Sequence, residues 1–248
     1  MVEWSACLAD AELITLSGML LRLVESQEQV ATNQLVSSLE RQQVLEAMLE
    51  STKPQLRSGT ERLHYLLSTP FRYPPLKHGS RFGARSAPSL FYGSLETGTV
   101  LAEAAYYRFL FWYGMVTPPA AKLDTQHTLF GAEYRTDKGL QLQASPFSAH
   151  VDVLRSPTDY AATQALGADM RAAGIEAFEF VSSRDPDGGI NVALFTPTAL
   201  SVKAPVFQEA WLCELSADRV SFHTAYSRNF YSFAIEVFQV SGKLPQAA

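Results

Sequence analysis

A basic, glycine-containing loop in the first half of the chain carries the first side chain with clear chemical potential. Arg81 lies between Gly79 and Gly83 in the stretch K-H-G-S-R-F-G-A-R. Glycines let backbone N–H groups approach an anion, and a guanidinium can bind a phosphate through two parallel hydrogen bonds. The loop therefore favours anion binding, with a structural turn and a solvated arginine as the alternative. The glycine spacings of the dinucleotide-binding and P-loop fingerprints are not present in the sequence.

Two more polar residues follow in apolar surroundings. Tyr92 ends the apolar stretch 89–92, and Glu103 lies in the apolar segment 100–113. A tyrosine at a strand end can present its ring or hydroxyl to a substrate, or it can be a core residue with a satisfied hydroxyl. A carboxylate in so apolar a segment needs partners, because burying an unpaired charge is costly. Arg108 is one candidate for an ion pair.

The last group lies far downstream, in F-V-S-S-R-D-P-D-G-G-I-N-V-A-L-F. Ser182 and Ser183 begin a turn, and Asn191 belongs to the strand that follows it. Taken by themselves, the serines are ordinary turn residues, and Asn191 is suited to cap or brace the turn.

These stretches resemble the RES family, which is named for its Arg, Glu and Ser. The family pattern is a Gly-x-Arg-aromatic loop, an aliphatic strand ending in Tyr, a helix with Ala-Glu, and a later Ser-x-Arg turn that leads into an Asn-bearing strand. Order and spacing both fit over roughly residues 62 to 195. The matching positions are Gly79 to Phe82, Leu90 to Tyr92, Ala102 with Glu103, Ser182 to Arg184, and Asn191 to Phe195.

The resemblance implies an ADP-ribosyltransferase-like fold and NAD as a consumed substrate. Carried over by position, the catalytic residues are Glu103, Arg81, Tyr92 and Ser182, and Asn191 joins the last three in binding NAD. Cleavage of the nicotinamide–ribose bond builds positive charge on the ribose, which an anionic Glu103 would stabilise. Arg81 would hold the pyrophosphate, Tyr92 would contact the nicotinamide–ribose portion, and Ser182 would position a ribose or the nicotinamide. No metal is implied.

The resemblance also implies a toxin of a bacterial toxin–antitoxin pair. The partner would be a cognate antitoxin that combines a DNA-binding region with a segment covering the active site. The acceptor of ADP-ribose stays open between a protein target, water and phosphate. The alternative is a non-catalytic module of the same fold that binds NAD or a partner.

Composition narrows the class of protein. A chain of 248 residues can form one large domain or two small ones, and its net charge of -5 argues against direct nucleic-acid binding. Cys7 and Cys213 form neither a metal motif nor a disulfide framework. The acidic N-terminus lacks the basic region of a secretory signal, and no apolar run has membrane-spanning length. We expect a cytoplasmic bacterial protein without membrane contact.

Residue patterns predict an α+β fold in which a helical N-terminal extension, residues 1–60, packs on a RES catalytic domain, residues 61–248. In the extension, Leu16 and Leu20 belong to a helical stripe that predicts helix over residues 8–55. Thr32 or Asn33 is expected to interrupt the helix, and Ser37 to begin its second part. The extension is expected to be a structural layer, with partner recognition as the alternative.

The second part of the chain is predicted to alternate strands and helices around a mixed sheet. A turn is expected at residues 137–139 because of the sequence Asp-Lys-Gly. Helices are expected over 100–113 and 157–173, and strands over 62–67, 89–92, 123–135, 140–143, 176–181, 190–195, 210–215, 220–224 and 230–240.

Overall fold

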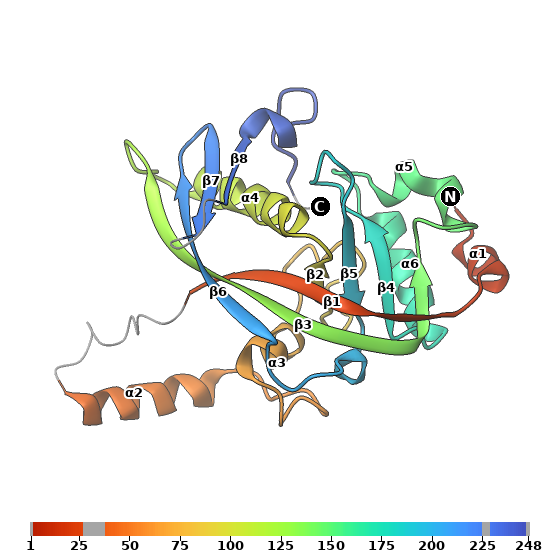
Figure 1. The fold of residues 1–248 in the computed structure, drawn as a ribbon, viewed down its shortest axis with the longest axis horizontal. Coiled ribbons are helices and arrows are strands. Elements are labelled where there is room, and N and C mark those ends of the chain that lie inside the picture. Colours follow the sequence, from red (N-terminus) through yellow and green to blue (C-terminus); the bar gives the residue numbers. More distant parts are fainter. Residues whose placement is uncertain (1, 27–37, 225–228, 247–248) are drawn as a thin grey trace.

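A computed structural model of the chain describes residues 2–26, 38–224 and 229–246. These residues form an eight-stranded mixed sheet with helices packed against it (Figure 1), which confirms the predicted α+β class. The strands are β1 (Ile14–Glu25), β2 (Phe91–Ser94), β3 (Leu123–Gln141), β4 (Ala177–Val181), β5 (Ile190–Leu194), β6 (Phe207–Leu215), β7 (Arg219–Thr224) and β8 (Phe230–Ala234). The helices are α1 (Trp4–Asp10), α2 (Leu39–Thr52), α3 (Tyr65–Arg72), α4 (Thr97–Gly114), α5 (Val151–Leu154) and α6 (Ala161–Ala172).

The 19-residue strand β3 organises the sheet. It pairs antiparallel with β1 and β6 and parallel with β4. Strand β1 also pairs with β2 through Leu21 and Ser94, β2 pairs with β5, and β5 pairs with β4. These contacts close five strands into a ring, and β6, β7 and β8 extend from β3 (Figure 1). Because of this closure, the N-terminal strand β1 lies close to the segments that carry Glu103 and Ser182.

The helix expected over residues 8–55 is wrong over Ile14–Glu25, where the chain forms β1. Residues four apart, such as Leu16 and Leu20, share a face in a helix and in a strand alike. Pairing with β3 over almost the full length of β1 decides between the two, and both leucines are buried in the resulting core. The N-terminal part of the chain is therefore not a purely helical extension.

The second predicted helix exists as α2, but it does not pack as a layer on the sheet. It begins after Ser38, whose side chain accepts from the N–H of Arg41, and it ends before Pro54 as expected. Its apolar side chains Val44 and Met48 are exposed. The breakpoints proposed at residues 32, 33 and 37 lie outside the described residues.

The turn predicted at residues 137–139 is wrong, because β3 runs through it without interruption. Pairing slips there between Ile14 opposite Gly139 and Leu16 opposite Thr136, which is a β-bulge. A Cβ on Gly139 would lie 2.4 Å from Cγ of Leu16. The glycine thus permits a close approach of β1 rather than a reversal of the chain.

The strand predicted over residues 62–67 is also wrong, since this segment leads into helix α3. The ring of His64 accepts from the backbone N–H of Leu66 and caps the helix. Leu66, Leu67 and Phe71 are buried against the sheet, a spacing that suits one face of a helix. The last predicted strand is too long, because a 3-10 turn at Ile235–Phe238 follows β8.

Helix α4 carries Glu103 and packs on the sheet through one face. Leu101, Tyr106 and Phe109 have no exposed surface and lie against β6 and β7 side chains such as Trp211 and Phe222. The opposite side is open, and Tyr107 and Phe111 are about half exposed. Because one face of α4 is packed against the sheet, the position of Glu103 relative to the strands is fixed.

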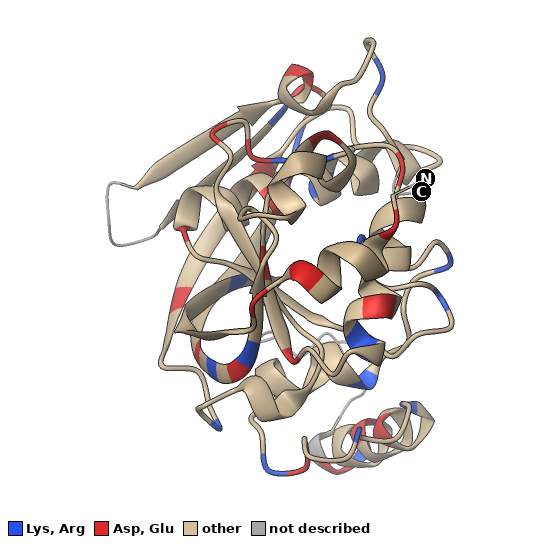
Figure 2. Cartoon of the chain, turned by 90° about the vertical axis from the view of Figure 1, so that its right-hand side faces the viewer, with Lys and Arg blue, Asp and Glu red and all other residues tan. Residues whose placement is uncertain are grey.

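The surface carries charges of both signs, spread over most elements (Figure 2), in keeping with the modest net charge of -5. Within the described ranges, no helix has the length and apolar character needed to cross a bilayer.

Substitution of Gly139 tests the bulge between β1 and β3. We expect Gly139→Ala to lower the free energy of unfolding by about 1–3 kcal/mol, because the new methyl group overlaps Leu16 and lies 2.9 Å from the carbonyl oxygen of Ile14. Urea unfolding measures the change. Gly114→Ala is the matched control, since a Cβ there meets nothing within 4 Å. Equal stability of the two variants would contradict the close approach.

Candidate active site

Glu103 lies in the second turn of α4, and one of its oxygens is held by two donors. Oε1 accepts from Oγ of Ser182 at 2.6 Å and from Nδ2 of Asn191 at 2.6 Å. Arg108, the ion-pair candidate from the sequence, instead pairs with Glu25 at 3.0 Å. Among the described residues, Oε2 of Glu103 has no hydrogen-bond partner. The carboxylate is thus fixed in orientation with one oxygen left for another molecule.

Ser182 lies behind Glu103 and has no exposed surface. Its hydroxyl accepts from the backbone N–H groups of Arg184 and Asp185, both at 3.0 Å, and donates its proton to Glu103. A second acid, Asp185, closes the same turn by accepting from the hydroxyl of Thr99 on α4 at 2.7 Å. The turn after β4 is therefore held against α4 at two points.

Asn191 completes the support of Glu103 from β5. Its side chain is buried, and its Oδ1 accepts from Oγ of Ser94 on β2 at 2.6 Å. Ser94 and Asn191 are also paired across the two strands. The Asn191 amide therefore links Ser94 on β2 to the Glu103 carboxylate on α4 through two hydrogen bonds.

Tyr92 lies on β2 with its hydroxyl tied to the arginine-bearing loop. The hydroxyl oxygen accepts from the N–H of Phe82 at 3.1 Å and is 2.9 Å from Oγ of Ser80. Burial raises the pKa of Tyr92 above its ordinary value, so the hydroxyl stays protonated at neutral pH. The ring forms a cavity wall, while the hydroxyl holds the loop in place.

Arg81 is anchored by the elements around its loop. Its guanidinium donates to the carbonyl oxygens of Leu154 and Ser156 and to the hydroxyl of Ser183, and it lies 4.6 Å from the ring centre of Tyr160. The side chain is 9% exposed, so much of its donor capacity is already used. Arg81 fastens the loop to the segment after α5 and leaves part of its surface facing a cavity.

These side chains surround a cavity of about 300 Å³, here called the Glu103 cavity. The structure thus brings together the five residues carried over from the RES pattern, with four at the cavity wall and Ser182 behind it. The wall includes Glu103, Arg81, Tyr92, Asn191, Tyr160, Phe180 and Arg22.

Arg22, on β1, is a cavity residue that the sequence analysis missed. Its Nη1 donates to the carbonyl oxygen of Tyr92 at 2.6 Å, while its Nε is buried and has no hydrogen-bond partner within the described ranges. No carboxylate pairs with it among the described residues. Burial lowers the pKa of Arg22 to about 10, which leaves the group charged at neutral pH. The signal in the sequence was an arginine in the apolar run M-L-L-R-L-V, but assigning that run to a helix hid its place beside Tyr92.

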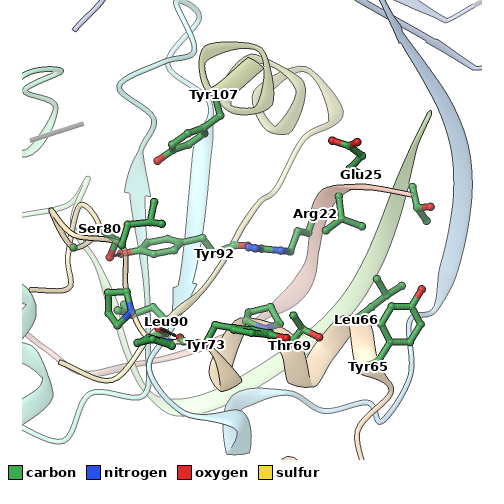
Figure 3. A pocket seen from close by; sticks show the side chains of 18 of the residues that line it. Arg22, Glu25, Tyr65, Leu66, Thr69, Tyr73, Ser80, Leu90, Tyr92 and Tyr107 are labelled. Atoms are coloured by element: carbon green, nitrogen blue, oxygen red, sulfur yellow. Dashed lines mark hydrogen bonds between the residues drawn. The ribbon is translucent and has the colours of Figure 1, made fainter. Parts of the chain in front are cut away.

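A second cavity, of about 400 Å³, adjoins the first (Figure 3). The two share Arg22, Ser80, Tyr92 and Tyr107. In Figure 3 the Arg22 side chain extends toward Tyr92, and the Tyr107 side chain projects from α4 toward the cavity. The shared wall therefore combines a cation with two aromatic rings.

The structure is that of an α+β protein with a cavity whose wall includes one oriented carboxylate. Comparison with protein-family models identifies a RES domain over residues 56–216, more than half of the chain. The chain therefore belongs to the RES-domain family, which is associated with NAD-related toxin function. No curated protein matches the chain. Glu103, Arg81, Tyr92, Ser182 and Asn191 all lie within the matched residues, whereas Arg22 precedes them.

The buried hydroxyl of Ser182 has a stability consequence that does not depend on any substrate. Ser182→Ala removes the acceptor of two buried N–H groups and one donor to Glu103. We expect the free energy of unfolding to fall by about 1–3 kcal/mol in urea titrations. Ser201→Ala, at an exposed position, provides the control and should change little. If both variants are as stable as the wild type, the hydroxyl does not close the turn.

Proposed function

We propose that this protein consumes NAD by cleaving the nicotinamide–ribose bond and passing ADP-ribose to an acceptor, as the toxin of a bacterial toxin–antitoxin pair. The observation that carries the proposal is the Glu103 carboxylate at the wall of a cavity. Two donors hold its Oε1, and its Oε2 has no hydrogen-bond partner among the residues that the structure describes. Family membership supports the same conclusion.

The chemistry requires stabilisation of positive charge. When the bond between ribose C1′ and the nicotinamide nitrogen breaks, both bonding electrons leave with nicotinamide, and the ribose becomes oxocarbenium-like. A carboxylate already oriented by Ser182 and Asn191 stabilises that charge without first reorganising. The acceptor nucleophile then bonds to C1′ and gives up a proton. Acceptors consistent with the proposal are a protein side chain, water and phosphate.

Two guanidinium groups support binding of the diphosphate. Arg81 faces the Glu103 cavity but already donates to two carbonyl oxygens and Ser183. Arg22 has a buried Nε without a partner and lies at the wall shared by both cavities. A partly buried cation with no carboxylate partner in the described part of the chain is favoured by an anionic ligand. We therefore assign the main diphosphate contact to Arg22, with Arg81 fixing the loop and the near end of the site.

The proposed partner is a cognate antitoxin with a DNA-binding region, so this chain would meet DNA only through that protein. The alternative from another class is a module that binds NAD or a partner without turnover. The two proposals differ in whether purified protein releases nicotinamide from NAD.

Nicotinamide release from labelled NAD, with and without cell lysate, is the primary test. Release by the purified chain alone indicates hydrolysis, or phosphorolysis when phosphate is added. Release only with lysate, with label on one protein, indicates protein ADP-ribosylation. Binding of NAD without release under either condition would support the non-catalytic module and overturn the enzymatic proposal.

Glu103→Gln tests the role of the charge. The substitution keeps the size of the side chain and an oxygen that can accept from Ser182 and Asn191. We expect the rate of nicotinamide release to fall about 100-fold or more, with the thermal unfolding midpoint nearly unchanged. Retained activity would show that the carboxylate is not the stabilising anion.

Arg22→Gln tests diphosphate binding. We expect KM for NAD to rise about 10- to 100-fold, because a charge-assisted contact to the diphosphate is lost. The KM of Arg22→Lys should lie between those of the wild type and Arg22→Gln, since lysine keeps the charge but lacks the paired N–H donors of a guanidinium. The control is Arg62→Gln, an exposed arginine that lines neither cavity. An unchanged KM in Arg22→Gln would remove this residue from the substrate site.

A further inference from the structure

The larger cavity beside the Glu103 site has no role in the chemistry described so far. It is lined by side chains of α3 and of the proline-rich segment after it, so we call it the tyrosine–proline cavity. The residues that define it are Tyr65, Thr69, Pro70, Tyr73, Pro74 and Leu90. Because it shares Arg22, Tyr92 and Tyr107 with the Glu103 cavity, the two are parts of one site (Figure 3).

The size of NAD requires both cavities. A dinucleotide has two nucleosides joined by a diphosphate, and a cavity of about 300 Å³ is at the lower end of the range for small-molecule sites. With the nicotinamide ribose at Glu103, the other nucleoside has to extend past the wall of that cavity. Arg22 lies at the wall that opens to the tyrosine–proline cavity, where a diphosphate would pass between the two.

The lining of the tyrosine–proline cavity suits a flat heterocycle. Tyr65 and Tyr73 are about half exposed, whereas Leu66 and Leu90 are buried. Tyr73 lies near Leu90 on one side of the cavity, and Tyr65 lies near Leu66 on the other (Figure 3). Aromatic rings stack on nucleobases, and apolar side chains cover the remaining surface of the base. Thr69 adds a hydroxyl to the lining that α3 contributes.

The charges at the cavity also permit an anion at Arg22. Among the described lining residues, the only carboxylate is that of Glu25. It is 3.0 Å from Nη1 of Arg108, so its charge is already paired. The Arg22 guanidinium is therefore the uncompensated charge at the boundary between the cavities.

We infer that the tyrosine–proline cavity binds the adenosine half of NAD, with the base against Tyr73 and the diphosphate at Arg22. This inference rests on the proposed function, since it takes the nicotinamide ribose to lie at Glu103. It assigns a binding role to α3 and the residues that follow it.

Comparison of NAD with nicotinamide mononucleotide, which lacks the adenosine half, tests the inference through turnover. We expect Tyr73→Ala to raise KM for NAD about tenfold, because one base–aromatic contact is lost. Cleavage of nicotinamide mononucleotide should not change. Tyr113→Ala, at an exposed tyrosine that lines neither cavity, should leave both substrates unaffected. Equal effects of Tyr73→Ala on the two substrates, or no effect on either, would overturn the inference. A loss of transfer to an acceptor with unchanged KM for NAD would also overturn it, because the cavity would then hold the acceptor.

Calorimetric titration with ADP separates this inference from the proposed function. The titration uses the Glu103→Gln protein and needs no turnover. We expect ADP to bind, and the added Tyr73→Ala substitution to weaken binding about tenfold, with Tyr113→Ala as the control. If ADP does not bind, the adenosine site is rejected even when the wild type cleaves NAD. If ADP binds in this pattern while the wild type releases no nicotinamide, the adenosine site stands and the catalytic proposal fails. Thermal unfolding midpoints exclude loss of fold in each variant.

Discussion

The requirement that a carboxylate in an apolar helix find hydrogen-bond donors shapes this structure more than any other single contact. A charge at the buried side of α4 is costly unless donors meet it. Ser182 and Asn191 supply them from 79 and 88 residues away along the chain. Neither donor is free to turn aside, since Ser182 also accepts two backbone N–H groups and Asn191 also accepts from Ser94. One oxygen of Glu103 thereby joins α4 to β5 and to the turn after β4, and Asn191 extends the connection to Ser94 on β2.

Closure of the strand ring places a cation, Arg22, at the wall that the two cavities share, whereas Arg81 lines only the Glu103 cavity. Strand β1 meets β2 through one residue pair, Leu21 with Ser94, and this contact carries Arg22 to the carbonyl oxygen of Tyr92. The approach is close enough that a Cβ on Gly93 would lie 2.8 Å from the carbonyl oxygen of Leu21. The position of Arg22 is thus a product of the topology, and it would be lost if residues 14–25 formed a helix.

The sequence predicted the elements whose residue patterns are local. Its predictions were wrong where contact with a segment distant in the chain determines the secondary structure. Strands β4 and β5, helix α4 and the residues Glu103, Ser182 and Asn191 were recognisable from apolar runs and motif spacing. Strand β1 was not, because the spacing of Leu16 and Leu20 fits a helix and a strand equally well until β3 is placed beside it. The prediction of a turn at Asp-Lys-Gly was wrong for the same reason. Glycine is needed at position 139 because the side chain of Leu16 approaches it from the neighbouring strand. Arg22 could not be assigned to the site before β1 was.

The burial of Ser182 separates two kinds of residue within one motif. Glu103, Arg81 and Tyr92 line the cavity, whereas Ser182 has no exposed surface and touches the site only through Glu103. A substrate would reach its hydroxyl only if the turn that this hydroxyl closes were to open. The position also demands a particular group: alanine lacks the acceptor for two N–H groups, and threonine adds a methyl group where no surface is free. Serine accepts two hydrogen bonds and donates one in the smallest volume. Its role in orienting Glu103 therefore explains its presence without any contact to a ligand.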